Sequence, residues 1–95
     1  MYIYLLKADK YTKIGISSRS VQGRVSAMQT GCPFFIDIIF FKYCESESII
    51  KYLEKMLHDK FADNNTQGEW FLLSKSDIEW CECQINKEIE QIINT

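Results

Sequence analysis

The sequence predicts a small α+β domain, in which a three-stranded antiparallel sheet is flanked by helices in the order β-β-α-β-α-α. Three observations predict this class. The chain has 95 residues, 46% of them apolar and 14% aromatic, which suffices for one compact core and leaves no room for a second. Strand-like runs dominate the first half. Apolar residues at helical spacing dominate the second half. We therefore expect residues 1–95 to form a single domain.

The chain opens with two strand-like runs. Residues 2–7 combine aromatic and β-branched side chains without a breaker, and residues 12–16 have a similar character. The polar stretch 8–11 between them can turn the chain. We expect an antiparallel hairpin, which brings Tyr4 and Lys13 close together on neighbouring strands.

A helix and a long strand follow. Ser20 is a suitable N-cap, and the helix should end at Thr30-Gly31. Arg24 lies at the margin of the apolar stripe of this helix, a placement that suits a side chain facing a cleft. Residues 34–43 are apolar on both sides, so we expect them to form the central strand of the sheet. The apolar stripe of the first helix, beside which Arg24 lies, comprises Val21, Val25 and Met28.

A second helix should begin at Ser46 or Ser48 and run to about Phe61. Glu54 and His58 are four residues apart and share a helical face beside its apolar stripe. Residues 63–68 have the composition of a loop, and residues 70–73 that of a short strand or extended segment. The apolar stripe of this second helix comprises Ile50, Leu53, Leu57 and Phe61.

The last predicted element is a helix over about residues 77–93. Ser76-Asp77-Ile78-Glu79 has the pattern of a capping box at its start. Apolar residues recur along one face, which would pack on the sheet or pair with a partner. They are Ile78, Cys81, Ile85, Ile89 and Ile92.

Charge and hydropathy exclude some function classes. The net charge of −2 argues against a general nucleic-acid coat protein. Residues 1–43 carry six basic and two acidic residues, a net charge of +4, whereas residues 44–95 carry five lysines and eleven acids, a net charge of −6. A phosphate backbone would therefore meet the first half more readily. No apolar run reaches the roughly 20 residues of a membrane span, and no signal-peptide pattern is evident, so we expect a cytoplasmic protein.

The cysteines do not suggest a metal frame. Cys81 and Cys83 are two residues apart in a helical pattern, so their side chains point to different sides. The remaining pair, Cys32 and Cys44, is not closely spaced, and His58 is the one histidine. We expect reduced, partly buried thiols rather than a zinc site or a disulfide framework.

The ordered occurrence of five short features resembles the GIY-YIG endonuclease superfamily, especially its compact single-domain members from phages and mobile elements. The resemblance covers residues 2–73. Each feature alone is a weak signal, whereas their order and spacing together are more specific. The features are Tyr2-Ile3-Tyr4, Lys13-Ile14-Gly15, Arg24, the pair Glu54 and His58, and Gly68-Glu69-Trp70-Phe71.

The resemblance implies a DNA endonuclease that hydrolyses phosphodiester bonds with one divalent cation, Mg²⁺ or Mn²⁺. Glu54 matches the glutamate that holds the cation together with water. Tyr4 matches the tyrosine that activates or orients the attacking water, and nearby cations would have to favour its phenolate. Arg24 matches the arginine that clamps the scissile phosphate.

The remaining matches are less direct. Lys13 stands where the name-giving second motif has tyrosine, and it could position water, lower the pKa of Tyr4 or bind phosphate. His58 is an auxiliary catalytic candidate that could relay a proton. The asparagine near the end of larger members has no clear counterpart. Further auxiliary candidates are Tyr11, Gly15 and Glu69.

Each of these residues also has an ordinary structural interpretation. Tyr4 could be a strand aromatic, and Glu54 with His58 could be a helix surface pair. The same fold could serve as a catalytically inactive DNA- or protein-binding module, or as an interaction protein acting through its last helix. The form of DNA (single-stranded, duplex or branched), the choice between DNA and RNA, and the presence of a homodimer or a larger protein partner stay open at this level.

Overall fold

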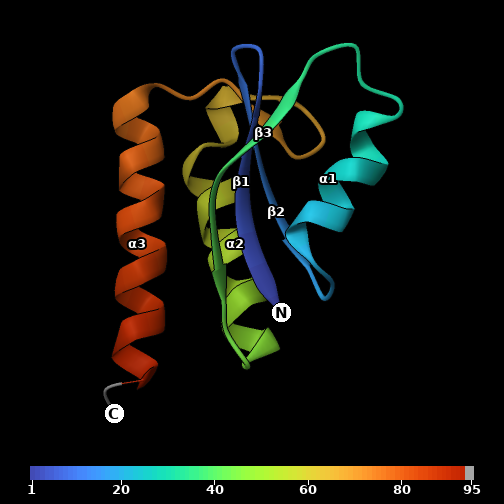
Figure 1. Ribbon diagram of the computed structural model, residues 1–95. Helices are drawn as coiled ribbons and strands as arrows, with labels where there is room; N and C mark the ends of the chain where they lie inside the picture. The colour runs from blue at the N-terminus through green and yellow to red at the C-terminus, as the bar shows by residue number, and fades with distance from the viewer. Residues whose placement is uncertain (94–95) are drawn as a thin grey trace.

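The computed structural model describes residues 1–93, with helices on both faces of one antiparallel sheet (Figure 1). The helices are α1 (Val21–Gln29), α2 (Glu47–Lys60) and α3 (Lys75–Ile93), with a short 3₁₀ helix η1 (Ala62–Asn64) after α2. The strands are β1 (Tyr2–Ala8), β2 (Tyr11–Ser17), β3 (Ile36–Tyr43), β4 (Asn65–Gln67) and β5 (Trp70–Phe71). Their order in the sheet is β3-β1-β2-β5-β4. The predicted α+β class is confirmed.

The sheet has five strands, so the prediction of three strands was wrong. The two additional strands, β4 and β5, form a short hairpin that extends the sheet beside β2. Gly68 starts the two-residue turn between them with φ +57°, a conformation that favours glycine. Strands of three and two residues are too short to show a periodicity, and for this reason the segment resembled a loop.

The prediction that residues 34–43 form the central strand was also wrong. β3 lies at the edge, and β1 occupies the interior position between β3 and β2. Phe34 and Phe35 lie outside the strand and are 48% and 76% exposed. An apolar strand need not be buried on both faces, because its aromatic residues can cover neighbours: the Tyr43 ring packs edge-on against Tyr2 at 5.1 Å.

The core has two layers, one on each face of the sheet. On one face α1 packs through Val21 onto Tyr4, Leu6, Ala8 and Ile36. On the other face α2 and α3 pack onto alternate residues of β1 and β2, because successive strand residues point to opposite faces. The buried residues of this second layer include Ile3, Leu5, Ile14, Ile50, Leu53, Leu57, Phe61, Cys81, Ile85 and Ile89. The predicted stripe of α2 is confirmed; the side chain of Ile92 lies outside the described residues.

Two helix starts show how local sequence sets the boundaries. The Gly23 amide donates to the Ser20 hydroxyl at 3.4 Å, which confirms Ser20 as the N-cap of α1. In α3 the capping box is formed by Ser74 and Asp77, through reciprocal bonds of 3.1 and 3.0 Å, and not by Ser76 and Glu79. α3 therefore begins at Lys75. This earlier start places Leu73 in the core together with Ile78, one turn into the helix.

All four cysteines are free. Cys44 and Cys81 are buried, Cys32 is half-buried and Cys83 is exposed. Burial raises the pKa of Cys81 to about 12, so its thiol stays protonated and serves as a small apolar core residue. Within residues 1–93 no helix combines the length and apolar character needed to cross a bilayer.

Candidate active site

The candidate site forms where β2 loses its strand partner. β5 pairs with β2 only at Thr12 and Lys13, and a last bond runs from the Ile14 amide to the Glu69 carbonyl at 3.2 Å. Beyond this point no strand in the described part of the chain pairs with this side of β2. We call residues 14–17 the open edge of β2. A backbone carbonyl left there needs another partner.

His58 of α2 supplies that partner. Its Nε2 donates to the Ile14 carbonyl at 2.9 Å, and its ring packs edge-on against Phe71 with centroids 4.9 Å apart. The contact ties α2 to β2 and places Glu54, one turn earlier, at the same edge. A carbonyl can only accept, so the hydrogen bond places the proton of a neutral ring on Nε2. His58 thus has a clear structural contact.

Tyr4 reaches the open edge from β1. In the hairpin Tyr4 faces Gly15, and Lys13 faces Leu6, so Tyr4 and Lys13 share a face as diagonal neighbours. The Tyr4 ring lies directly over Gly15: a Cβ added at Gly15 would stand 2.5 Å from the Tyr4 hydroxyl oxygen and 2.6 Å from Cζ. The group that needs the close approach at Gly15 is therefore the Tyr4 ring. The hydroxyl itself is buried without a hydrogen-bond partner.

The electrostatics of Tyr4 differ from the expectation that cations would favour its phenolate. Burial raises the pKa of Tyr4. The Arg24 guanidinium, close to the Tyr4 hydroxyl, lowers this pKa, and the carboxylates of Glu69 and Glu54 raise it further. The net direction is upward, so the phenol is protonated at neutral pH. The Tyr4 hydroxyl thus carries a proton that it could donate to a bound group.

Lys13 is held in place by two contacts. Its ammonium pairs with Glu69 at 3.3 Å and lies 5.7 Å from the centre of the Trp70 ring. The Lys13 side chain is 15% exposed and that of Glu69 is 41% exposed, so Glu69 is the more accessible partner of the pair. The turn that begins with Gly68 presents Glu69 to Lys13. The motif of residues 68–71 is therefore explained by the hairpin and by this ion pair.

Glu54 is the group that could hold a cation. One of its carboxylate oxygens, Oε2, is buried without a hydrogen-bond partner. Burial raises the pKa of this carboxyl, the Glu69 charge raises it further, and the charges of His58 and Lys13 lower it. A free carboxylate oxygen is the type of ligand that Mg²⁺ and Mn²⁺ prefer. Within residues 1–93 no group of three or more His, Cys, Asp and Glu side chains could hold a metal, so water or phosphate oxygens would have to complete the coordination around Glu54.

Arg24 lines a hollow of about 600 Å³ at the far end of β2. The side chain is exposed on α1, and Val21, one turn earlier, is buried against the sheet. Arg19 lines the same hollow, and it was missed in the sequence. The available signal was a lone basic residue within a run of serines, Ser17-Ser18-Arg19-Ser20. Two guanidinium groups at one hollow suit the binding of a phosphate.

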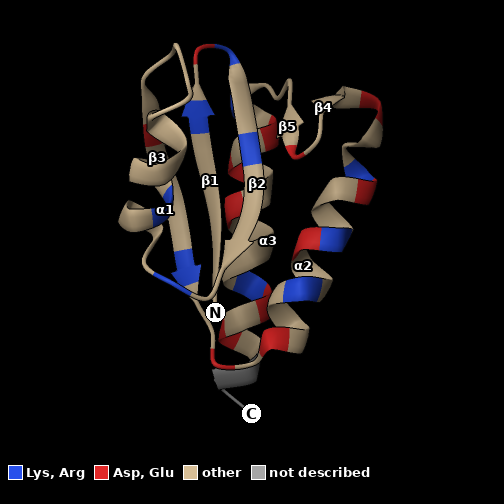
Figure 2. Ribbon diagram, turned by 90° about the vertical axis from the view of Figure 1, so that its right-hand side faces the viewer, with Lys and Arg blue, Asp and Glu red and all other residues tan. Residues whose placement is uncertain are grey.

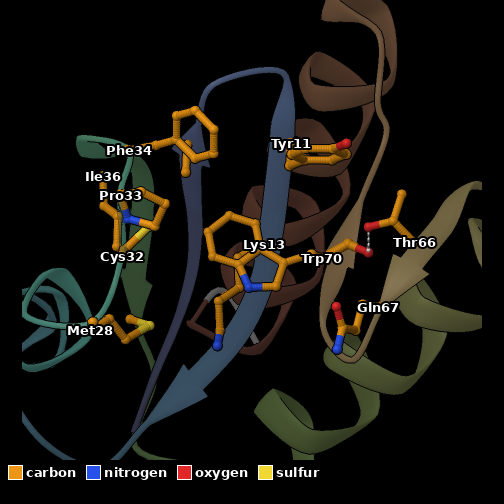
Figure 3. Close-up of a pocket in the computed structure, with 12 residues that line it drawn as sticks. Tyr11, Lys13, Met28, Cys32, Pro33, Phe34, Ile36, Thr66, Gln67 and Trp70 are labelled. Carbon is orange, nitrogen blue, oxygen red and sulfur yellow. Dashed lines mark hydrogen bonds between the residues drawn. The ribbon is translucent and has the colours of Figure 1, made fainter.

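Tyr11 is the remaining auxiliary candidate from the sequence. Tyr11 shares a groove with Lys13 and Trp70 and is not among the groups that act on the Tyr4 hydroxyl (Figure 3). Asn64 and Asn65 donate to the Leu72 and Gly68 carbonyls at 3.1 and 2.7 Å, so they stabilise the β4–β5 segment.

The charge distribution agrees with the position of this site. Figure 2 shows acidic bands along α3 and lysines along β1 and β2. α3 carries five acids and two lysines, whereas β1 and β2 carry Lys7 and Lys13 and no acid. A polyanion would therefore approach the sheet and α1 more readily than α3.

The fold is a small α+β domain that is compatible with a nuclease-like fold. The whole chain, residues 1–95, matches the family model of the T5orf172 domain, and the chain belongs to this family. The T5orf172 domain is phage-associated, has a DNA-binding or nuclease-like role, and is related to endonucleases of the GIY-YIG and HNH types. No curated protein and no solved structure matches the chain.

Gly15→Ala should lower the free energy of unfolding by about 1–3 kcal/mol, because the new Cβ would overlap the Tyr4 ring. Gly23→Ala is the matched control: its Cβ meets open space within α1, so we expect an increase of about 0.5–1 kcal/mol. Urea denaturation measures both values. Equal stability of the two variants would show that the Tyr4 ring does not lie against Gly15.

Glu54→Gln should raise the melting temperature by a few degrees at neutral pH. The folded state raises the pKa of Glu54 above its ordinary value of 4.5, so ionisation of this carboxyl destabilises the fold above that pH. The gain should vanish as the pH falls below about 4.5, where the carboxyl is protonated in both states. Thermal unfolding as a function of pH measures the effect, with the exposed Glu45→Gln as control. A Glu54→Gln variant less stable than wild type at pH 7 would contradict this account.

Proposed function

We propose that this protein is a divalent-cation-dependent DNA endonuclease of the GIY-YIG type. One observation carries the proposal. The Tyr4 hydroxyl, on the strand β1, and the Glu54 Oε2 atom, on the helix α2, are both buried without hydrogen-bond partners near the open edge of β2, and the Glu54 charge acts on the Tyr4 hydroxyl. Such atoms are rare because each costs free energy, and a pair of unpartnered polar atoms is typical of a site that binds something. The third such atom in the described residues is Thr12 Oγ1, which is on β2.

The reaction is the hydrolysis of a phosphodiester. The oxygen of a water molecule forms a bond to phosphorus, the bond to the 3′ oxygen breaks, and the departing oxygen takes up a proton. A divalent cation at Glu54 would supply charge neutralisation for the phosphate and the leaving oxygen. The proposed roles of the protein residues are to hold the phosphate, to orient the water and to keep Glu54 in position.

Arg24 suits the phosphate because its planar fork can donate two parallel hydrogen bonds, and its exposure leaves it free to do so. Among the three roles open to Lys13, phosphate binding has the best support. Its charge acts on Glu54 and is not among the causes that shift the pKa of Tyr4. Tyr4, as a protonated phenol, would orient the water or a phosphate oxygen by hydrogen bonding.

His58 would act as a positioning residue, and not as a proton relay. Its Nε2 hydrogen is engaged by the Ile14 carbonyl, and Phe71 packs on its ring. These contacts hold the segment of α2 that carries Glu54 against β2. Glu69 would have a similar role toward Lys13.

A second candidate function is a DNA-binding module without catalysis. The raised pKa of Tyr4 favours it, because a protonated phenol cannot accept a proton from water. The unpartnered Glu54 oxygen favours the enzyme, since a binding module for an anion gains nothing from a buried carboxylate.

Wild-type protein should cleave labelled DNA when Mg²⁺ or Mn²⁺ is added, and Glu54→Gln should lower the cleavage rate by about 100-fold or more. Arg24→Lys, which keeps the charge but loses the fork, should lower it by about 10- to 100-fold. Gel analysis of single-stranded, duplex and branched substrates measures the rates, with Glu45→Gln as control for the loss of one acidic charge.

The same preparations give a second result that does not depend on cleavage. Mg²⁺ should raise the melting temperature of the wild type and of Arg24→Lys, but not that of Glu54→Gln, because a ligand stabilises only a state that binds it. Equal cleavage by the wild type and Glu54→Gln would refute the proposed role of Glu54. Folded protein that binds DNA and never cleaves it would support the binding module.

A further inference from the structure

A groove of about 640 Å³ lies beside the candidate site, on the face of the sheet that α1 covers (Figure 3). Its floor is formed by β2 and β5, through Tyr11, Lys13 and Trp70. One wall is the segment from the end of α1 to the start of β3, which includes Phe34, and the opposite wall is β4, through Thr66 and Gln67. We call this feature the aromatic groove.

Three aromatic side chains from distant parts of the sequence surround this groove. In Figure 3 the Trp70 indole lies near the centre, with the Tyr11 ring and the Phe34 ring to either side of it and above it. Tyr11 and Trp70 are half-buried, whereas Phe34 is 48% exposed and lies outside the strand β3. Phe34 is therefore available to contact a bound molecule, and core packing does not account for its position.

The charge of the groove indicates the kind of molecule. Lys13 is the one charged side chain among the described residues that line it, and no acid lines it, although the chain carries a net charge of −2. Lys10 is nearby, with its ammonium 5.5 Å from the centre of the Tyr11 ring. Aromatic faces next to ammonium groups suit a ligand that combines flat rings with negative charge, as a nucleotide does.

Lys13 connects the groove to the candidate site. Its ammonium lies 5.7 Å from the Trp70 ring centre within the groove, and its charge lowers the pKa of Glu54 at the open edge of β2. A phosphate bound at Lys13 would thus lie between the cation ligand and the aromatic rings. The next nucleotides of the same strand would be directed into the groove.

We propose that the aromatic groove binds unpaired bases beside the cleaved phosphate, so that the substrate is single-stranded or locally unpaired DNA. This inference rests on the proposed endonuclease function. Bases within a duplex are paired and stacked on one another, so their faces are not free to stack on Trp70 or Phe34. The groove has the volume of a small-molecule site, which suits one or a few nucleotides of a single strand.

The test uses Trp70 as its own reporter. The chain has two tryptophans, so Trp80→Phe leaves Trp70 as the sole one. This variant, in the presence of a chelator to prevent cleavage, is titrated with a single-stranded dT 12-mer and with a duplex of equal length. We expect the single strand to quench Trp70 fluorescence and to bind at least about tenfold more tightly than the duplex.

Neighbouring phenylalanines supply a matched pair of variants. In the same background Phe34→Ala should weaken binding of the single strand by about 5- to 20-fold, because one stacking surface is lost. Phe35→Ala removes an equally large side chain that is 76% exposed and does not line the groove, so it should leave binding unchanged. Circular dichroism verifies that both variants are folded. Equal effects of the two substitutions, or equal quenching by the duplex, would overturn the proposal.

The outcomes separate this inference from the proposed function. Quenching of Trp70 by the single strand, without metal-dependent cleavage in the cleavage assay, would support the groove and refute the endonuclease. Metal-dependent cleavage that Glu54→Gln abolishes, without quenching of Trp70 by the single strand, would refute the groove and support the endonuclease. If the groove binds a protein partner instead, neither the single strand nor the duplex will bind, and that result also overturns the proposal.

Discussion

The candidate site depends on the incomplete pairing of β2. β5 pairs with β2 only at Thr12 and Lys13, which leaves the Ile14 carbonyl without a strand partner among the described residues. The His58 Nε2 atom donates a hydrogen bond to that carbonyl at 2.9 Å. This bond holds α2 at the edge of the sheet, with Glu54 on the same helical face as His58. A longer β5 would have paired with residues 14–17 and filled the space. The short β4–β5 hairpin therefore determines where the candidate site forms, and its turn also supplies Glu69, which holds Lys13.

The site is formed at a cost to the fold. The Tyr4 hydroxyl and one Glu54 oxygen are withdrawn from water without gaining hydrogen bonds, and burial raises both of their pKa values. Gly15 adds a further constraint, because only a residue without a Cβ leaves room for the Tyr4 ring above β2. Polar atoms held in this way are characteristic of functional sites, which keep groups ready for a ligand at the expense of stability. This is the physical reason for assigning a function to a small, acidic domain in a nuclease-like family.

Sequence patterns predicted the parts of the structure that local chemistry determines. The first hairpin, the Ser20 N-cap and the apolar stripe of α2 depend on residues a few positions apart, and all three are observed. The position of β3 depends on which strands are its neighbours, and its apolar pattern resembled that of an interior strand. The β4–β5 hairpin was too short to show periodicity. In the site, Tyr4 and Glu54 could be selected from residue identity alone. The tertiary structure was needed to show that both have a buried polar atom without a hydrogen-bond partner. It was also needed to show the ion pair of Lys13 and the carbonyl that His58 binds.

The central claim is that Tyr4 and Glu54 act together on one phosphate at the open edge of β2. A double-mutant cycle of Tyr4→Phe and Glu54→Gln, measured as single-turnover cleavage of a labelled DNA strand, tests it most directly. If the two groups serve one catalytic unit, the double variant should be no slower than the slower single variant, because each substitution already disables the unit. Rate losses that multiply across the two substitutions would show that Tyr4 and Glu54 act independently, and would contradict a shared role at one phosphate.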